Sequence, residues 1–309
     1  NNEMSSQYNV RGGTYDENSV YVNGLEVHRP LLIRSGQQEG LSFVNTDMVE
    51  NVDFSAGGFD AKYGDKMSSV LDIRYKRPTA LESRLNMSLL GASAYIGWGD
   101  SVQSQMHGIR YKTSKYMLGA LDTKGNYKPN FLDYQTQMTW KVGKQRDWDI
   151  TLLGNFSQNS YEFMPDSAVK DWGGLDAIEQ KIEHEGKEKD MFRTAFVALS
   201  ASGKVHPEVT ISADLNGFYT HEQETYDIRT AYVLRQKDMN EANNSGGGYD
   251  ANGELATPDG NKKLLGKGEY HEHARNTLQS GIITLAHNGE WKRGTNTLKW
   301  GVSGQVEMI

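Results

Sequence analysis

Long segments in which apolar and polar residues alternate constrain the fold of this chain more than any other feature. From Val209 to Tyr219 the odd positions are apolar or glycine, whereas Thr, Ser, Asp and Asn occupy most even positions. Residues 132–142, 148–156 and 298–306 follow the same rule. Strand side chains point alternately to two faces, so a period of two predicts strands with one apolar and one polar face. These segments exceed the usual strand of about 5–6 residues, and the chain is predicted to be mainly β.

The connections between these segments alternate between two lengths. Short turns are expected at residues 143–147, 203–207 and 292–296, and long connections at 119–130, 165–188 and 229–270. Compact soluble domains rarely carry long structureless loops, whereas transmembrane β-barrels have short turns at one rim and long loops at the other. The alternative is a soluble sandwich, but the Thr, Ser, Asn, Asp and Gln of the polar faces favour a wet lumen. We expect about nine strands, at residues 81–91, 92–98, 104–118, 131–143, 147–164, 189–204, 208–228, 271–289 and 296–309, and a short helix at residues 178–182.

The N-terminal quarter of the chain differs, because glycines interrupt it at short intervals. A first strand is predicted to end at Gly12 and Gly13, and later ones at residues 18–22, 49–54 and 68–75. Asn23-Gly24 between extended segments indicates a tight turn, because both residues tolerate positive φ. By itself this part has the character of a small mixed domain.

Several motifs in this part resemble, in order and spacing, the plug domain of TonB-dependent receptors, and more narrowly those of the Bacteroidetes type. Residues 10–13 (Val-Arg-Gly-Gly) are similar to the family's (I/V)RG motif, and residues 20–24 (Val-Tyr-Val-Asn-Gly) to its V-x-V-(D/N)-G strand. Residues 49–54 and 68–73 are similar to its later strands, and Tyr63-Gly64 is kept between them. Beyond residue 78 the resemblance is architectural.

This resemblance implies a small mixed α/β plug domain inside a 22-stranded antiparallel transmembrane β-barrel. Residues 1–78 are then the plug without its N-terminal part, and residues 79–309 the first nine or so barrel strands with long extracellular loops. We therefore expect the chain to be a piece of a longer polypeptide. Structural roles in the plug motifs are expected for Gly12, Gly13, Asn23, Gly24, Tyr63 and Gly64.

One charged residue of the motifs has an expected role in holding the plug. In the family, two plug arginines pair with barrel glutamates, and Arg11 is the candidate for one such latch through a charge-assisted contact. The position of the second arginine is occupied by Ala56. The second half of the latch is therefore expected to be missing or replaced.

Residues 28–38 are the longest N-terminal segment without strand character. In the family, plug loops that reach the extracellular side form the floor of the substrate pocket. Arg29, Arg34 and Gln37 are therefore candidate ligand contacts, and contact with the barrel wall is the alternative for the same residues.

Composition excludes several other classes of function. The chain has no cysteine, which rules out disulfides and thiolate sites. Its net charge is −7, and basic and acidic residues are interspersed, so the sequence shows no basic cluster of the kind that binds nucleic acid. No catalytic arrangement stands out, so neither an enzyme nor a cofactor is predicted. His271 and His273 share a strand face without an identifiable third ligand, and residues 249–254 lack most of a calcium loop, so no metal is predicted.

The resemblance implies TonB-dependent import of a scarce or large ligand (a siderophore, cobalamin, glycan or peptide) across the Gram-negative outer membrane. Expected partners are TonB with its inner-membrane energising complex, outer-membrane lipid and the unknown ligand. A surface lipoprotein is a further candidate partner. The alternative is a structural or assembly barrel of an envelope complex in which transport is secondary.

Overall fold

Two sheets account for most of the chain in the computed structural model, which describes residues 8–14, 17–28, 42–64, 67–113, 125–144, 147–172, 178–236 and 264–309. The small sheet has the strand order β2-β1-β4-β3. Its strands are β1 (Asn18–Val22), β2 (Leu25–Glu26), β3 (Val49–Ser55) and β4 (Ser69–Tyr75), and the short 3-10 helix η2 (Thr46–Met48) precedes β3. β1 and β4 are parallel and the other pairs antiparallel, so the sheet is mixed. We call the described residues from 8 to 78 the N-terminal unit.

The local predictions for the N-terminal unit were confirmed except for its first strand. Asn23 and Gly24 have φ of 54° and 81° and close the two-residue turn between β1 and β2. The strand expected before Gly12 was wrong for the described residues 8–13. Arg11 and Gly12 have φ of 49° and 82°, and the backbone N–H of Gly13 donates to the Val10 carbonyl at 2.9 Å. The positive φ values turn the chain before it can join the sheet edge.

The long sheet is antiparallel and follows the chain, with the order β14-β13-β12-β11-β9-β8-β7-β6-β5 and the short β10 paired to β11. Its strands are β5 (Glu82–Ser88), β6 (Gly91–Gly99), β7 (Gln103–Thr113), β8 (Gly125–Val142), β9 (Trp148–Pro165), β10 (Ala168–Trp172), β11 (Ile178–His206), β12 (Val209–Gln236), β13 (Leu264–Arg293) and β14 (Asn296–Met308). β5 and β14 are its edges, so the described sheet is open. No helix of the described residues is both long and apolar enough to span a membrane.

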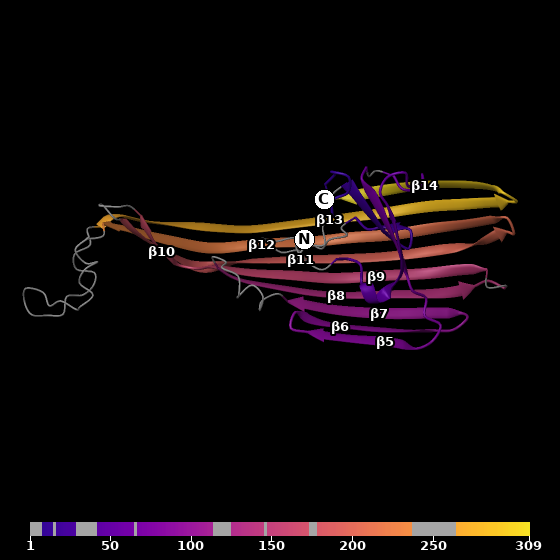
Figure 1. Cartoon of the computed structure of the whole chain (residues 1–309), viewed down its shortest axis with the longest axis horizontal. Coiled ribbons are helices and arrows are strands. Elements are labelled where there is room, and N and C mark those ends of the chain that lie inside the picture. Colours follow the sequence, from indigo (N-terminus) through magenta and orange to yellow (C-terminus); the bar gives the residue numbers. More distant parts are fainter. Residues whose placement is uncertain are drawn as a thin grey trace, which may run out of the picture.

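Four strands are longer than the sequence suggested: β11, β12, β13 and β8, which begins at Gly125, within the connection expected at residues 119–130. β11, with 29 residues, spans about 95 Å at about 3.3 Å per residue. The helix expected at residues 178–182 is wrong, because these residues begin β11 and pair with β10 and β12. The connection expected at residues 229–270 is shorter, because β12 and β13 continue side by side as far as Arg235 and Leu264. In Figure 1 the strands β11–β13 run far past the ends of β5–β7.

The outer face of the long sheet, turned away from the N-terminal unit, carries a band of exposed apolar side chains, as the alternation predicted. Val197, Leu215 and Leu285 are 56%, 50% and 62% exposed. On β12 the band extends from Val209 to Tyr219, eleven residues, which matches the about 9–11 residues of a tilted membrane-spanning strand. A polar row follows it directly, formed by the cross-strand neighbours Gln158, Arg193, His221 and Gln279.

The inner face of the long sheet carries the N-terminal unit. Figure 1 shows the small sheet crossing the long strands over the half that bears the short turns. One hydrophobic core joins the two, with Val22, Phe43 and Ile73 from the N-terminal unit and Leu153 and Phe196 from the long sheet all nearly inaccessible. The rings of Phe43 and Phe196 meet edge to face at 5.6 Å. The two sheets are therefore packed together and not merely adjacent.

Candidate functional site at the contact between the two sheets

A buried ion pair on the inner face of the long sheet is the centre of this contact. Arg110 of β7 and Asp133 of β8 are direct cross-strand neighbours. The Arg110 Nε and Nη2 donate to the two carboxylate oxygens of Asp133 at 2.7 and 2.8 Å, a bidentate geometry. The Asp133 side chain is fully buried and that of Arg110 is 12% exposed. Asn155 of β9 also donates to this carboxylate, at 3.1 Å, so the buried charge is well satisfied.

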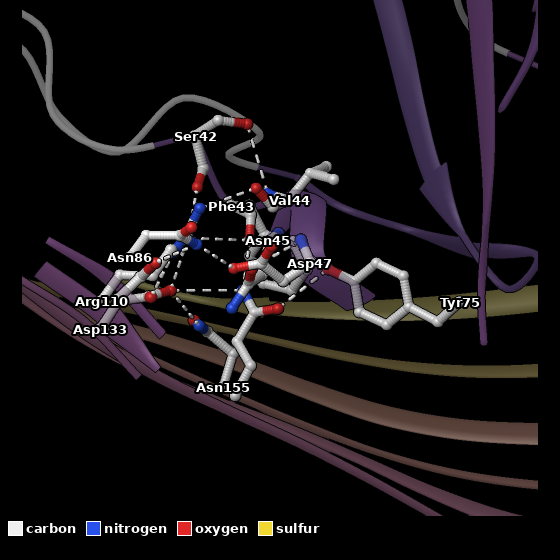
Figure 2. A network of polar contacts seen from close by, with 12 residues as sticks. Ser42, Phe43, Val44, Asn45, Asp47, Tyr75, Asn86, Arg110, Asp133 and Asn155 are labelled. Atoms are coloured by element: carbon white, nitrogen blue, oxygen red, sulfur yellow. Dashed lines mark hydrogen bonds and ion pairs between the residues drawn. The ribbon is translucent and has the colours of Figure 1, made fainter. Parts of the chain in front are cut away.

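The same guanidinium holds the main chain of the N-terminal unit. Its Nη1 donates to the Val44 carbonyl and its Nη2 to the Ser42 carbonyl, both at 2.8 Å. The amide of Gln135 on β8 donates to the carbonyl of Phe43, between these two residues. Figure 2 shows these groups converging from the long sheet on residues 42–44. Three successive main-chain oxygens, those of residues 42–44, are thus bound by two side chains of the long sheet.

A tyrosine of the small sheet extends this network. The Tyr75 hydroxyl donates to Gln135 Oε1 at 2.9 Å and accepts the backbone N–H of Asn45 at 3.2 Å. Burial raises the pKa of Tyr75 well above its usual range, so the hydroxyl remains a neutral donor. Because Tyr75 ends β4, the network connects β4, residues 42–45 and the inner face of β8.

The helix η2 is fixed next to this network. The side chain of Asn45 caps it by accepting the N–H of Asp47 at 3.1 Å. The carboxylate of Asp47 accepts from Arg84 at 2.9 Å and from Asn86 at 3.3 Å, both on β5. Gly108 of β7 makes room for this segment, since a Cβ there would lie 2.4 Å from Asn45 Nδ2.

Two further contacts attach the N-terminal unit to the long sheet, at positions nearer the short turns. Asn23, in the tight turn after β1, donates from its side-chain amide to Gln137 Oε1 at 2.6 Å and accepts the N–H of Tyr75 at 2.9 Å. Arg77, just after β4, pairs with Asp149 of β9 at 2.5 Å. Asn23 therefore has a second role, contact with the long sheet, beyond the predicted turn.

In a further ion pair, at β14, the N-terminal unit supplies the acidic residue and the long sheet the basic one, the reverse of Arg77–Asp149. Asp60, in the connection between β3 and β4, contacts Lys299 Nζ at 3.0 Å. The hydrogen bond from Lys299 lowers the pKa of Asp60, so the pair gives a stabilisation that is complete above the usual carboxyl pKa of about 4 and lost as the pH falls through the lowered value. Both side chains are about half exposed, so solvent screens the pair.

We expect Asp60→Asn to weaken attachment of the N-terminal unit only slightly, by less than about 1 kcal/mol, because exposed ion pairs contribute little. A double-mutant cycle with Lys299→Gln, read by amide hydrogen exchange in residues 57–64 at low and high salt, measures the coupling. The coupling should shrink at high salt and below about pH 4. A coupling that is unchanged by salt would contradict this assignment.

The predicted latch residue, Arg11, contacts its own unit in the structure. Arg11 is exposed in its turn, and its guanidinium lies over Gly57. Within the described residues it makes no ion pair, and its role as a latch stays a prediction. The most buried arginine between the two sheets is Arg110, which belongs to the long sheet. Arg84 of β5 and Arg77 of the N-terminal unit form more exposed ion pairs between the sheets.

The other motif residues lie inside the N-terminal unit. Gly13 packs against the hydrogen bond from Ser68 to Glu17, where a Cβ would clash. The Tyr63 hydroxyl donates to the buried Asp72 at 2.6 Å. Gly12 lies in a turn, and Gly64 lies in the irregular segment between β3 and β4. Burial raises the pKa of Tyr63 above its usual range. Arg29, Arg34 and Gln37 fall outside the described residues.

The histidine pair lies within a strand. His271 and His273 are on β13 with ring centroids 5.6 Å apart, and His271 contacts Asp227, which also pairs with Arg275 at 3.1 Å. Among the described residues, no group of three His, Cys, Asp or Glu side chains is arranged to hold a metal. Residues 249–254 are outside the described ranges.

Comparison with known protein families gives a match for the N-terminal part of the chain. Residues 1–69 match the family described as TonB-dependent Receptor Plug Domain. No curated protein matches the chain. TonB-dependent receptors are outer-membrane transport proteins and not enzymes.

Solved structures with a similar arrangement share little sequence with the chain. They include the outer membrane transporter YddB from Escherichia coli, at 13% identity over 95% of this chain and 49% of that chain, with a TM-score of 0.37. A mutant of the ferric enterobactin receptor PfeA from Pseudomonas aeruginosa, in complex with enterobactin, is 13% identical over 96% and 51%, with a TM-score of 0.39. The siderophore receptor PirA from Acinetobacter baumannii is 14% identical over 96% and 50%, with a TM-score of 0.38.

The chain thus spans about half the length of these structures. Residues 1–69 match the plug domain family of TonB-dependent receptors, and the chain continues from this match into the strands of the long antiparallel sheet.

Proposed function

We propose that this chain is the plug and the first strands of a 22-stranded barrel that imports a scarce or large ligand by TonB-dependent displacement of the plug. The observation that carries the proposal is the buried Arg110–Asp133 pair. It fastens a plug domain to the polar inner face of a sheet whose outer face has an apolar band of membrane-spanning width. A barrel closed in this way blocks diffusion at rest and requires work to open.

The contacts of residues 42–48 indicate what opening has to overcome. Segment 42–44 is held through main-chain oxygens, and the Asp47 carboxylate through two donors of β5. The network is compact, so displacing these residues breaks several bonds together. Energy supplied through TonB and its inner-membrane complex accounts for such a step. Arg29, Arg34 and Gln37, directly before this segment, are the proposed ligand contacts, and Arg11 remains a proposed second latch.

The ligand class is one that is too large or too scarce for passive pores: a siderophore, cobalamin, a glycan or a peptide. A surface lipoprotein is a further proposed partner on the extracellular side. The polar side chains of the inner face, such as Thr194, Ser157 and Thr220, are suited to a path lined by hydrogen-bonding groups.

Uptake of labelled members of these four classes in cells with and without TonB tests the proposal. We expect uptake of one class that depends on TonB. A variant lacking residues 1–78 should conduct ions in planar bilayers without TonB, while heat-modifiable gel mobility verifies that its barrel is folded. A folded, non-conducting plugless barrel, together with absence of TonB-dependent uptake, would favour the assembly role instead.

A further inference from the structure

The outer face of the long sheet changes in charge immediately beyond the apolar band. Across the band, from Val209 to Tyr219 on β12 and from Val205 to Ala195 on β11, the outward side chains carry no charge. The first charged outward residue past the band is Arg193, in the row that includes Gln158 and His221. The band therefore ends at a definite level on neighbouring strands.

Basic residues outnumber carboxylates on the part of the outer face that follows. The outward cations within about six residues of the boundary are Lys128, Lys187, Lys189, Arg193 and Arg275, and the outward carboxylates at the same level are Glu162 and Asp227. We call these seven residues the outer basic patch. The patch has five cations and two carboxylates and thus a surplus of positive charge, whereas the whole chain is negative.

The carboxylates of the patch are already occupied. Glu162 contacts Lys187 at 3.1 Å and Lys128 at 3.3 Å. Asp227 contacts Arg275 at 3.1 Å and also His271. Lys189 is exposed, and its cross-strand neighbour on β9 is Glu162, which is already paired with Lys187 and Lys128.

Arg193 is also without a carboxylate partner among the described residues. Its Nε donates to the neutral Gln158 Oε1 at 3.1 Å, and its side chain is exposed. Its terminal nitrogens are therefore available for a planar acceptor such as phosphate.

Farther along the same strands the charges balance. Arg229 lies between Glu185 at 3.5 Å and Glu269 at 2.5 Å, and Lys181 contacts Glu183 at 2.7 Å. The surplus of positive charge is thus confined to the level directly beyond the apolar band. A charge surplus confined to that level is unlike a solvated surface, where both signs are interspersed.

We propose that the outer basic patch binds the phosphate groups of lipid headgroups in the leaflet on the side of the long connections. A lipid whose chains cover the apolar band places its phosphate at the level of Arg193 and Lys189. Charge complementarity and the direct continuity of the patch with the band both favour a lipid over a soluble anion. The inference rests on the membrane location of the protein and not on import.

The test compares Lys189→Gln/Arg193→Gln on β11 with a control, Lys181→Gln/Arg235→Gln, which removes the same two side-chain types farther from the apolar band, on β11 and its neighbour β12. The protein is reconstituted into phosphatidylcholine vesicles that contain either spin-labelled phosphatidylglycerol or spin-labelled phosphatidylcholine. The fraction of immobilised label gives the preference for phosphatidylglycerol, whose phosphate charge is not balanced by the choline cation that phosphatidylcholine carries. Both variants retain neutral polar side chains, so folding is expected to persist.

We expect the unchanged protein to prefer phosphatidylglycerol over phosphatidylcholine. In the Lys189/Arg193 variant this preference should fall about fivefold for each charge removed. The control should keep it. Equal losses in both variants, or no preference in the unchanged protein, would overturn the inference. Suppression by inorganic phosphate at constant ionic strength would assign the patch to a soluble anion and would overturn it as well. Failure of the unchanged protein to insert into vesicles would instead contradict the membrane location on which the inference rests.

Discussion

Replacing Arg110 by methionine is expected to free residues 42–48 of the plug from the barrel wall. Methionine preserves much of the side-chain volume but leaves the fully buried Asp133 without its cation, and breaking a buried pair in this way costs about 3–5 kcal/mol. The carbonyls of Ser42 and Val44 lose their donors at the same time. Amide hydrogen exchange in residues 42–48 should become about a hundredfold faster or more, and ion conductance in planar bilayers should rise.

Two further variants separate the contributions to this effect. Arg84→Met removes a contact of similar length to Asp47, 2.9 Å, but Arg84 is 57% exposed, so we expect a loss within about 1 kcal/mol. Arg110→Met/Asp133→Leu removes both buried charges and should recover barrel stability, because neutral packing often replaces a buried pair without loss. It should not restore slow exchange at residues 42–48. Unchanged exchange in Arg110→Met would show that this pair does not hold the plug.

A valine at Gly108 should push the plug from the wall without altering any charge. The added Cβ would lie 2.4 Å from Asn45 Nδ2 and 3.4 Å from Met48 Sδ. Asn45 and Met48 are 1% and 0% exposed, so neither has free space into which to move. Overpacking of this kind costs about 1–3 kcal/mol, and we expect faster exchange at residues 45–49 with a smaller rise in conductance than for Arg110→Met.

The matched control for this change is Gly217→Val. Gly217 lies in the apolar band of β12, and a Cβ there has no neighbour within 4 Å. Valine favours strands, so this variant should be neutral or slightly stabilising and should leave the plug unaffected. Both variants are examined by the same exchange experiment and by gel mobility of the folded barrel. An equal effect of both would mean that the valine acts on the strand and not on the plug.

The alternation of residues was sufficient to predict the strands that cross the apolar band. Burial of one face and exposure of the other follow from a period of two, so Val209 to Tyr219 could be assigned to an apolar face without knowing any neighbour. The turn at Asn23-Gly24 was equally local, because positive φ is a property of the two residues themselves.

The contact between plug and wall could not be predicted in this way. Arg110 and Asp133 were visible as charged residues on polar faces, but their pairing depends on the register between β7 and β8. The hydrogen bonds to the main-chain carbonyls of residues 42–44 do not depend on which side chains those residues carry, so the sequence does not reveal them. The family motif drew attention to Arg11 in the N-terminal unit, whereas the buried arginine between the sheets, Arg110, belongs to the long sheet. The length of β11–β13 was missed for a related reason: charged ladders such as Glu185–Arg229–Glu269 replace apolar alternation there.

Arg110 and Gln135 contact residues 42–44 through main-chain oxygens, and every amino acid offers the same oxygen. Substitutions of the Ser42 or Val44 side chain therefore leave the attachment to the wall in place. The segment directly before them, with Arg29, Arg34 and Gln37, is where we expect ligand contacts. In the proposed receptor, changes in that segment would alter ligand preference while the contacts that hold residues 42–44 to the long sheet are kept, so selectivity and gating would be free to evolve separately.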